Sequence, residues 1–409
     1  MPNRIASETL IPCGRSLVVS FAFTMTVVVG LTIPLSQSAQ AQNYQVLHYF
    51  TGGADGTYPA ASLTMDADGN YYGTSNGGRG KVFKLSHKDT GWIFTPLQTL
   101  TGSSAYAPVV FGRDGALYGT TRGGGRSGCG TIFKLTPPEH VSPNIMGGWT
   151  ETVLYEFRGA PDGCDPVFSP VTFDGAGNMY LTTALGGADY DGGAVIKLSP
   201  YHGGWIESVI HSFPYYSNPL SGVILDNSGN LYGTLLRDSV FQLTPSGSSW
   251  ILSILHDFGG ENNGNYPTGG LVMDQAGNLY GTTRSFGPNG GGTVFELVPA
   301  NGSWTFSLLH SFTGYADGGP WGSLAMDATG NLYGTTCYDS AYGHGAVFKL
   351  TRGISGWTYT SLHDFTGSDG GYPYAGVVFD KTGNLYGATT GGGIGCGSYG
   401  CGVVFQITP

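Results

Sequence analysis

Charged side chains are scarce in this chain, since Lys, Arg, Asp and Glu together make up 11% of its 409 residues. This composition excludes a charged helical bundle. Positive charge is the scarcer of the two signs, with 17 Lys and Arg against 27 Asp and Glu and a formal net charge of -10. A mildly acidic surface argues against nucleic acid and against an anionic membrane surface as partners.

Apolar runs of membrane-spanning length are also missing. The run at residues 17–31 is shorter than the roughly 18 residues that a spanning helix needs. Arg4 and Arg15 supply positive charge near it, and Ala39-Gln40-Ala41 has the small-x-small form of a signal-peptidase site. We predict a cleaved signal peptide at residues 1–41 and a secreted or periplasmic mature chain that is not attached to a membrane. A membrane anchor is the alternative interpretation of the run.

Catalytic and nucleotide-binding motifs are missing as well. The sequence has no nucleotide loop, no His-Glu-x-x-His motif and no Gly-x-Ser-x-Gly in a strand-turn-helix context. The glycine runs at residues 123–125 and 391–393 precede apolar strands, so they are loops and not phosphate cradles. The sequence therefore predicts no cofactor.

A repeated phrase is the most informative feature that is present. The phrase Asn-Leu-Tyr-Gly-Thr at residues 278–282 returns in variant forms, and the seven copies begin at Asn70, Ala116, Asn178, Asn230, Asn278, Asn331 and Asn384. Their spacing of roughly 46 to 62 residues is typical of propeller blades and other repeat arrays.

Each repeat reads as four short strands. In residues 270–312 a short apolar strand (271–274), a tight turn (275–277), a second strand (278–283), a glycine-rich loop and a third strand (293–297) follow one another. The fourth strand, 304–312, alternates apolar and polar residues with period two. Four antiparallel strands per unit, seven times repeated, predict an all-β fold: a seven-bladed β-propeller formed by residues 42–409 as a single domain.

The two ends of the repeat region complement each other. The last repeat has only three strands, and residues 44–50 match a fourth one, with Leu-His-Tyr-Phe at 47–50 resembling Leu-His-Ser-Phe at 309–312. We predict that the N-terminal strand pairs into the last blade and closes the ring, which removes an open sheet edge. An open β-solenoid is the alternative.

The repeats resemble those of the GloVer tandem-repeat family of exported bacterial proteins. The resemblance is carried by Gly-Asn-Leu-Tyr-Gly-Thr-Thr at 277–283, Gly-Thr-Val-Phe at 292–295 and Leu-His-x-Phe at 309–312, and it extends from about residue 44 to the C-terminus. It implies a secreted, propeller-like array with no established activity. The units are more weakly similar to the NHL and lactonase-type propeller repeats.

The cysteines fit an exported propeller, because disulfides are the usual state of cysteine outside the cytoplasm. Cys129 and Cys164 fall in loops that we expect on one face of the ring, and Cys396 and Cys401 share a loop of the last blade. We predict these two disulfides, which leave Cys337 outside both bonds. Because no Cys-x-x-Cys pair exists, a zinc site is not predicted.

Two further patterns resemble metal sites. Histidines share one repeat position on the expected outermost strands: His48, His211, His256, His310 and His363. Each belongs to a different blade, so we predict packing between blades. The acidic turns at 66–70 and 226–230 resemble calcium loops but have neither the Glu at position 12 nor the helices of an EF-hand, so we predict turn capping. No metal site is predicted.

The central channel is the usual place for propeller chemistry. Small residues stand where the innermost strands begin, namely Ala61, Ala107, Ser169, Ser221, Gly269, Gly322 and Ala375. Neither they nor the strand residues after them bring Glu, Asp or His together, and hydrolysis or elimination needs such groups. A lactonase-like hydrolase or lyase acting in the channel is therefore the alternative, and a non-catalytic protein is preferred.

The loops on one face hold the candidate binding residues. These are Asp55, Tyr58, Asp162, Phe168, Tyr266, Trp321, Asp369, Tyr372 and Tyr374. Aromatic rings beside carboxylates suit sugars, because rings stack on CH faces while polar groups bond hydroxyls. The alternative is that Tyr-Pro and Pro-Trp pin the loops against neighbouring blades. We interpret the chain as a secreted binding or scaffold module for a glycan or a cell-surface protein, with a glycan preferred; the sequence leaves the oligomeric state open.

Overall fold

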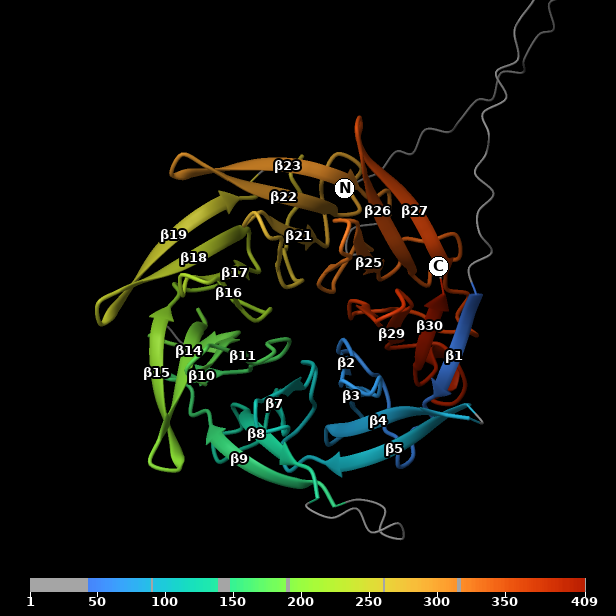
Figure 1. Ribbon diagram of the computed structural model, residues 1–409, viewed down its shortest axis with the longest axis horizontal. Helices are drawn as coiled ribbons and strands as arrows, with labels where there is room; N and C mark the ends of the chain where they lie inside the picture. The colour runs from blue at the N-terminus through green and yellow to red at the C-terminus, as the bar shows by residue number, and fades with distance from the viewer. Residues whose placement is uncertain are drawn as a thin grey trace, which may run out of the picture. The chain divides into compact units, whose positions relative to one another are not determined.

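The described residues form a ring of seven antiparallel four-stranded sheets (Figure 1). The computed structural model describes residues 43–89, 91–138, 148–188, 192–259, 262–314 and 318–408, so the predicted signal peptide at 1–41 lies outside the described residues. In six of the sheets the strands follow chain order from the channel to the rim. The predicted seven-bladed β-propeller is confirmed.

The strands of the first four blades have the following bounds. The first blade consists of β2 (Thr64–Met65), β3 (Tyr71–Ser75), β4 (Lys81–Lys88) and β5 (Gly91–Thr99). The second consists of β6 (Val110–Phe111), β7 (Leu117–Thr121), β8 (Thr131–Thr136) and β9 (Thr150–Glu156). The third consists of β11 (Thr172–Phe173), β12 (Met179–Thr183), β14 (Ala194–Tyr201) and β15 (Gly204–Ser212), beside a small sheet of β10 (Gly163–Cys164) and β13 (Leu185–Gly186). The fourth consists of β16 (Ile224–Leu225), β17 (Leu231–Leu235), β18 (Ser239–Ser246) and β19 (Ser249–Asp257).

The remaining blades repeat the pattern. The fifth consists of β20 (Val272–Met273), β21 (Leu279–Thr283), β22 (Thr293–Ala300) and β23 (Ser303–Ser311). The sixth consists of β24 (Ala325–Met326), β25 (Leu332–Thr336), β26 (Ala346–Gly353) and β27 (Gly356–Asp364). The seventh consists of β28 (Val378–Phe379), β29 (Leu385–Thr389), β30 (Val403–Thr408) and β1 (Asn43–Tyr49). A 3-10 turn, η1 (Gly397–Tyr399), precedes β30.

The seventh blade closes the ring with strands from both ends of the sequence. β1 pairs antiparallel with β30, with Tyr44 opposite Ile407 and Val46 opposite Phe405. Figure 1 shows β1, in blue, along the outer edge of β30, in red. The predicted closure by the N-terminal strand is confirmed, and β30 has a partner on both of its sides.

The hydrophobic core lies between the blades. Seven clusters of buried residues each join two neighbouring blades, and the cluster that holds Phe50, Tyr71 and Tyr386 joins the seventh blade to the first. Because each blade packs on both of its faces, the second strands are buried along their whole length, as β21 is from Leu279 to Thr283. Burial of apolar surface on two faces explains why these strands are rich in apolar residues and Thr instead of alternating with charged ones.

The acidic turns are held by their own hydrogen bonds, as the sequence predicts. In the fifth blade Asp274 Oδ1 accepts hydrogen bonds from the backbone N–H groups of Ala276 and Asn278, both 2.9 Å long. Asp274 Oδ2 accepts from Asn278 Nδ2 at 2.8 Å and from the Tyr280 hydroxyl at 3.1 Å. In six of the seven blades an Asp, an Asn and a Tyr therefore fix the hairpin that joins the first strand to the second. The second blade has Gly112 and Ala116 at the Asp and Asn positions.

The histidines of the outermost strands pack between blades. His310 of β23 meets the ring of Phe312 edge-on and stacks on Tyr359 of the next blade, with ring centroids 4.5 Å apart. His256 stacks in the same way on Phe306 at 4.2 Å, and His48 on Phe94 at 3.9 Å. The predicted role in packing between blades is confirmed for these histidines.

This packing predicts a dependence of stability on pH. Burial lowers the pKa of His211, His256 and His310, and it also lowers the pKa of His48 and His363 against the opposing effect of Asp55 and Asp369. The unfolded chain takes up these protons at the ordinary histidine pKa of about 6.5, before the folded chain does. We therefore expect the contribution of the neutral histidines to be complete above pH of about 6.5 and to be lost as the pH falls below it.

The substitution His310→Tyr tests this dependence. Tyr155 holds the same repeat position in the second blade, opposite Ile132, so a tyrosine is compatible with the site. The free energy of unfolding is measured with guanidinium at a series of pH values for the variant and for the unsubstituted protein. Below pH 6.5 the slope of this free energy against pH should be smaller in the variant by up to about 1.4 kcal/mol per pH unit. An unchanged slope in a variant that folds normally would contradict the assignment.

Candidate functional site

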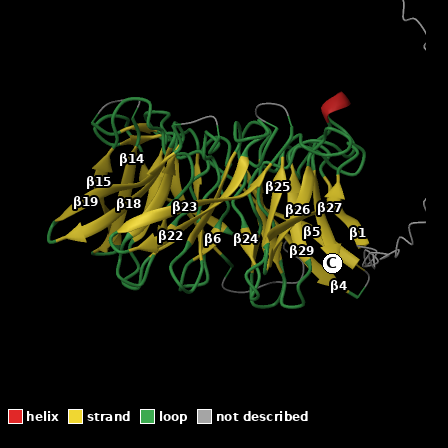
Figure 2. Cartoon of the chain, turned by 90° about the horizontal axis from the view of Figure 1, so that it is seen from above, coloured by secondary structure: helices red, strands yellow, loops and turns green. Residues whose placement is uncertain are grey.

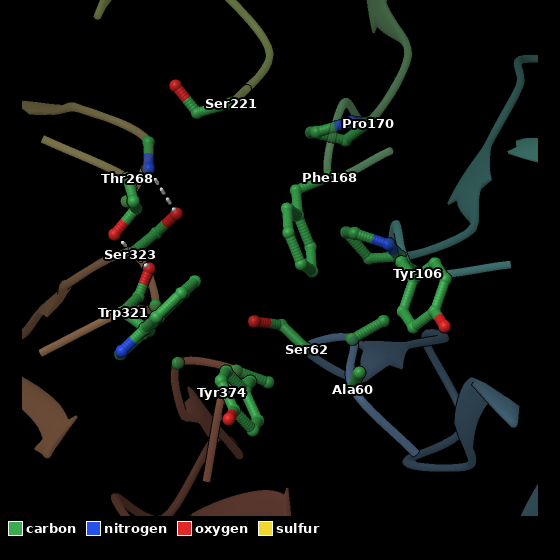
Figure 3. Close-up of a pocket in the computed structure, with 17 residues that line it drawn as sticks. Ala60, Ser62, Tyr106, Phe168, Pro170, Ser221, Thr268, Trp321, Ser323 and Tyr374 are labelled. Carbon is green, nitrogen blue, oxygen red and sulfur yellow. Dashed lines mark hydrogen bonds between the residues drawn. The ribbon is translucent and has the colours of Figure 1, made fainter. Parts of the chain in front are cut away.

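A cavity of about 70 Å³ opens at the mouth of the central channel, where the innermost strands begin (Figure 3). Four aromatic side chains from four blades line it: Tyr106, Phe168, Trp321 and Tyr374. They occupy one repeat position, four residues before the first residue of the innermost strand in each blade. Four repeats therefore contribute one aromatic side chain each to the mouth, and no single repeat contains the site.

The repeated phrase positions these mouth residues. In five blades the Thr of the phrase donates its hydroxyl hydrogen to the backbone carbonyl of a small residue that lies three residues before the next innermost strand. Thr335, for example, donates to the carbonyl of Ala375 at 2.8 Å, next to Tyr374. Small residues are required there, because a Cβ atom on Gly322 would lie 2.3 Å from the backbone nitrogen of Gly376.

The aromatic rings form two pairs on different sides of the cavity (Figure 3). Trp321 and Tyr374 meet edge to face with centroids 5.0 Å apart, and Tyr106 and Phe168 do so at 5.8 Å. All four side chains are half-buried, so each ring keeps an accessible surface. The pairs can present ring faces to a ligand without moving.

Hydroxyl groups complete the cavity, and charged groups do not take part in lining it. Ser62, Ser221, Thr268 and Ser323 are among the lining residues, whereas Asp, Glu, Lys, Arg and His are not. Ser323 Oγ accepts a hydrogen bond from the backbone N–H of Gly270 at 2.9 Å, and Thr268 donates to the carbonyl of Trp321 at 3.3 Å. The cavity thus offers neutral polar groups beside aromatic surface.

Trp321 contacts a cation that does not line the cavity. The guanidinium of Arg284 lies 4.5 Å from the centroid of the Trp321 ring and 4.9 Å from that of Tyr266. Such contacts stabilise an aromatic ring by about 0.5–2 kcal/mol. Tyr266, which the sequence proposes as a binding residue, does not line the cavity but contacts the same guanidinium as Trp321.

Two of the Tyr-Pro loops, those of Tyr58 and Tyr372, bond to a neighbouring blade through the backbone of the tyrosine. Tyr58, Tyr266 and Tyr372 have φ of 52°, 57° and 56°, a left-handed conformation that is rare for a bulky residue. The N–H of Tyr58 bonds to the carbonyl of Cys401, and that of Tyr372 to the carbonyl of His344, each at 2.8 Å. The backbones of Tyr58 and Tyr372 thus pin these loops against neighbouring blades, whereas their side chains remain half-buried.

The candidate carboxylates bind within their own loops. Asp55 accepts hydrogen bonds from the backbone N–H and the hydroxyl of Thr51 and lies 3.2 Å from His48 Nε2. Asp369 bonds to Thr366 and His363 in the same arrangement. Asp162 accepts from the Tyr155 hydroxyl at 3.0 Å. The structure does not bring these three carboxylates to the cavity, which holds Phe168, Trp321 and Tyr374 of the sequence-predicted set.

Both predicted disulfides are present. Cys129–Cys164 joins the β7–β8 loop to the loop that leads into the third blade, and Cys396–Cys401 closes a short loop around η1. Cys337 is buried and outside both bonds. Among the described residues no group of three or more His, Cys, Asp or Glu side chains could hold a metal ion, and no described helix is long and apolar enough to cross a bilayer.

Sequence reasoning missed Tyr106 and Tyr399. Tyr106 lines the cavity, and its signal was available, because it stands at the repeat position that Trp321 and Tyr374 occupy in their blades. Tyr399 lies in η1 and stacks on Tyr372 with ring centroids 5.0 Å apart. Nothing in the repeat pattern indicates Tyr399, because the loop that carries it is particular to the last blade.

The fold and its mouth define a closed seven-bladed β-propeller built from tandem repeats. The chain belongs to the Gloeobacter/Verrucomicrobia repeat family, whose model matches residues 35–175, 140–306 and 237–409. This membership confirms the family resemblance. No curated protein matches the sequence.

Solved propellers are similar in fold. A candidate 6-phosphogluconolactonase from Bacteroides fragilis is 13% identical with a TM-score of 0.52, over 81% of this chain and 96% of the other. A gluconolactonase from Xanthomonas campestris is 14% identical with a TM-score of 0.42, over 90% and 89%. PorZ, a surface component of the type-IX secretion system of Porphyromonas gingivalis, is 14% identical with a TM-score of 0.48, over 89% and 48%. At such identities the likeness shows the fold alone.

Proposed function

We propose that this protein is an exported, non-catalytic binding module whose channel mouth binds a neutral carbohydrate. The observation that carries the proposal is the convergence of Tyr106, Phe168, Trp321 and Tyr374 on a cavity that is lined by hydroxyls and by no charged side chain. Aromatic faces accept the CH faces of a sugar ring, and Ser and Thr hydroxyls exchange hydrogen bonds with sugar hydroxyls. A cavity of about 70 Å³ accommodates part of a sugar and leaves the rest on the surface.

A hydrolase or lyase acting in the channel has less support. Acid–base catalysis needs a side chain that gives or takes a proton close to neutral pH. Burial raises the pKa of Tyr374 well above its ordinary value, so its hydroxyl stays protonated. The lining also contains no cation that would favour a phosphorylated sugar.

The two disulfides support export, since such bonds persist in oxidising compartments. The predicted cleavage after Ala41 can be checked by intact-mass measurement of the protein recovered from outside the cytoplasm. A mass that includes residues 1–41 would contradict the predicted cleavage.

Binding is tested with an array of neutral and charged glycans, using the mature chain of residues 42–409. We expect a neutral glycan to bind, and the substitution Trp321→Ala to lower the affinity about tenfold or more, because stacking and its supporting Arg284 contact are lost together. Tyr201→Ala is the matched control, because Tyr201 is 56% exposed on the rim hairpin of the third blade, away from the mouth. The proposal fails if no glycan binds, or if Tyr201→Ala and Trp321→Ala have equal effects.

A further inference from the structure

A second group of aromatic rings continues from the mouth over the sixth, seventh and first blades. It consists of Tyr374, Tyr338, Tyr372, Tyr399 and Tyr58, which we call the tyrosine track. Tyr374 contacts Trp321 at the mouth, and burial, together with the neighbouring side chains of Cys337 and Tyr338, raises the pKa of its hydroxyl. The mouth and the track therefore share Tyr374, which lies beside Trp321 on one side and near Tyr338 on the other.

Four rings of the track, from Tyr338 to Tyr58, form an unbroken series of ring contacts. Tyr338 and Tyr372 have centroids 5.1 Å apart, Tyr372 and Tyr399 stack at 5.0 Å with an angle of 4° between their planes, and Tyr399 meets Tyr58 edge to face at 5.8 Å. Tyr338 is 43% exposed and Tyr399 is 39% exposed. Exposed aromatic rings in mutual contact are uncommon on a monomer surface and mark interaction sites.

Local covalent and backbone constraints hold two tyrosines of the track, Tyr399 and Tyr372, in place. Tyr399 lies in η1, inside the loop that the Cys396–Cys401 disulfide closes. Tyr372 has a left-handed backbone, and its hydroxyl hydrogen-bonds with His344 Nδ1 at 3.1 Å. Rigid aromatic residues lose little conformational freedom on binding, so they raise affinity at low entropic cost.

We propose that the tyrosine track is an extended binding surface and that the ligand of this propeller is an uncharged oligosaccharide of several sugar rings. The proposal rests on the proposed carbohydrate function and deepens it. The mouth takes one end of the chain, because its cavity of about 70 Å³ has no room for more. The following sugars lie on the exposed rings of Tyr338 and Tyr399, whose hydroxyls and ring faces match the alternating polar and CH surfaces of a sugar chain.

The test compares glycans of increasing length. The mature protein is titrated calorimetrically with the neutral glycan that binds best on the array and with its shorter fragments, down to the single terminal sugar. We expect affinity to rise with length over the first three to four sugars. Tyr399→Ala should weaken the longer glycans about tenfold and leave the single sugar unchanged, whereas Trp321→Ala should weaken every length.

A second variant tests the rigid loop. Cys396→Ser combined with Cys401→Ser keeps all rings of the track but opens the loop that holds Tyr399. We expect the same length-dependent loss as for Tyr399→Ala, with Tyr201→Ala again as the unaffected control.

The outcomes separate the two proposals. If no glycan of any length binds, the carbohydrate function itself is wrong. If glycans bind with the same affinity at all lengths, or if Tyr399→Ala has no effect on the longer ones, the mouth functions alone and the track proposal is overturned. A protein partner that depends on Tyr399, in the absence of oligosaccharide binding, would replace the sugar chain as the occupant.

Discussion

A chain that begins at Thr51, and so lacks β1, is expected not to form the closed propeller. Without β1 the seventh blade loses its outermost strand, and the edge of β30 is exposed to aggregation. The deletion also removes Phe50, which is fully buried between the seventh and first blades, and Tyr44, which packs on Phe405. Removal of one buried Phe side chain costs about 3–5 kcal/mol, against a total stability of about 5–15 kcal/mol. Circular dichroism melting and size-exclusion chromatography should show an unfolded or aggregated protein.

The matched control moves the strand instead of removing it. Asn43 lies opposite Thr408, so a turn of a few residues after Pro409 can lead directly into a relocated segment of residues 43–50. This permuted chain starts at Thr51 and contains every blade residue. We expect its melting temperature to be close to that of the original chain. A truncated chain that melts as the full chain does would contradict the role of β1 in closure.

The repeat pattern predicts the blades and their closure because these features are local and repeated. The Asn-Leu-Tyr-Gly-Thr phrase identifies the second strand of every blade, and the missing fourth strand of the last repeat identifies β1 as its replacement. The disulfides follow from the same topology, since Cys129 and Cys164 lie in loops on one face. These predictions needed only the order of strands along the chain.

The candidate site is predicted less well, because it depends on which loop side chains turn toward the channel. Asp55 and Phe168 both lie in loops between blades, yet Asp55 bonds to its own loop while Phe168 lines the mouth. Strand order cannot distinguish the two. The tyrosine track joins Tyr58 to Tyr399, residues from opposite ends of the repeat region that are brought together only by ring closure.

The Gly of the repeated phrase has a packing reason that the sequence alone does not reveal. In the fourth blade Gly233 lies opposite Phe241, and a Cβ atom on Gly233 would lie 2.6 Å from Cζ of the Phe241 ring. Gly–Phe pairs stand at this position in six blades. The third blade instead pairs Leu181 with Ile196, and both are fully buried. The branched Leu occupies the space that the missing ring leaves free.

The Leu–Ile pair of the third blade predicts that the energetic effects of substituting Gly233 and Phe241 are strongly coupled. Gly233→Leu alone should destabilise the protein by about 3 kcal/mol or more, because the core has no room for the side chain beside Phe241. Phe241→Ile alone should cost about 2 kcal/mol through the cavity that it leaves. The double variant reproduces the Leu–Ile pair of the third blade, with Val223 as the neighbour that corresponds to Val171. We therefore expect its loss of stability to be about 2–3 kcal/mol smaller than the sum of the two single losses.

Guanidinium unfolding of the four proteins measures this coupling as a double-mutant cycle. Strictly additive single effects would show that the third blade tolerates Leu181 for another reason. A recovered stability would mean that blades can exchange their central residues only as pairs. The Tyr-Gly-Thr phrase and the Phe of the third strand would then be one unit of the repeat, in which Gly makes room for the ring and Thr binds the next blade at the mouth.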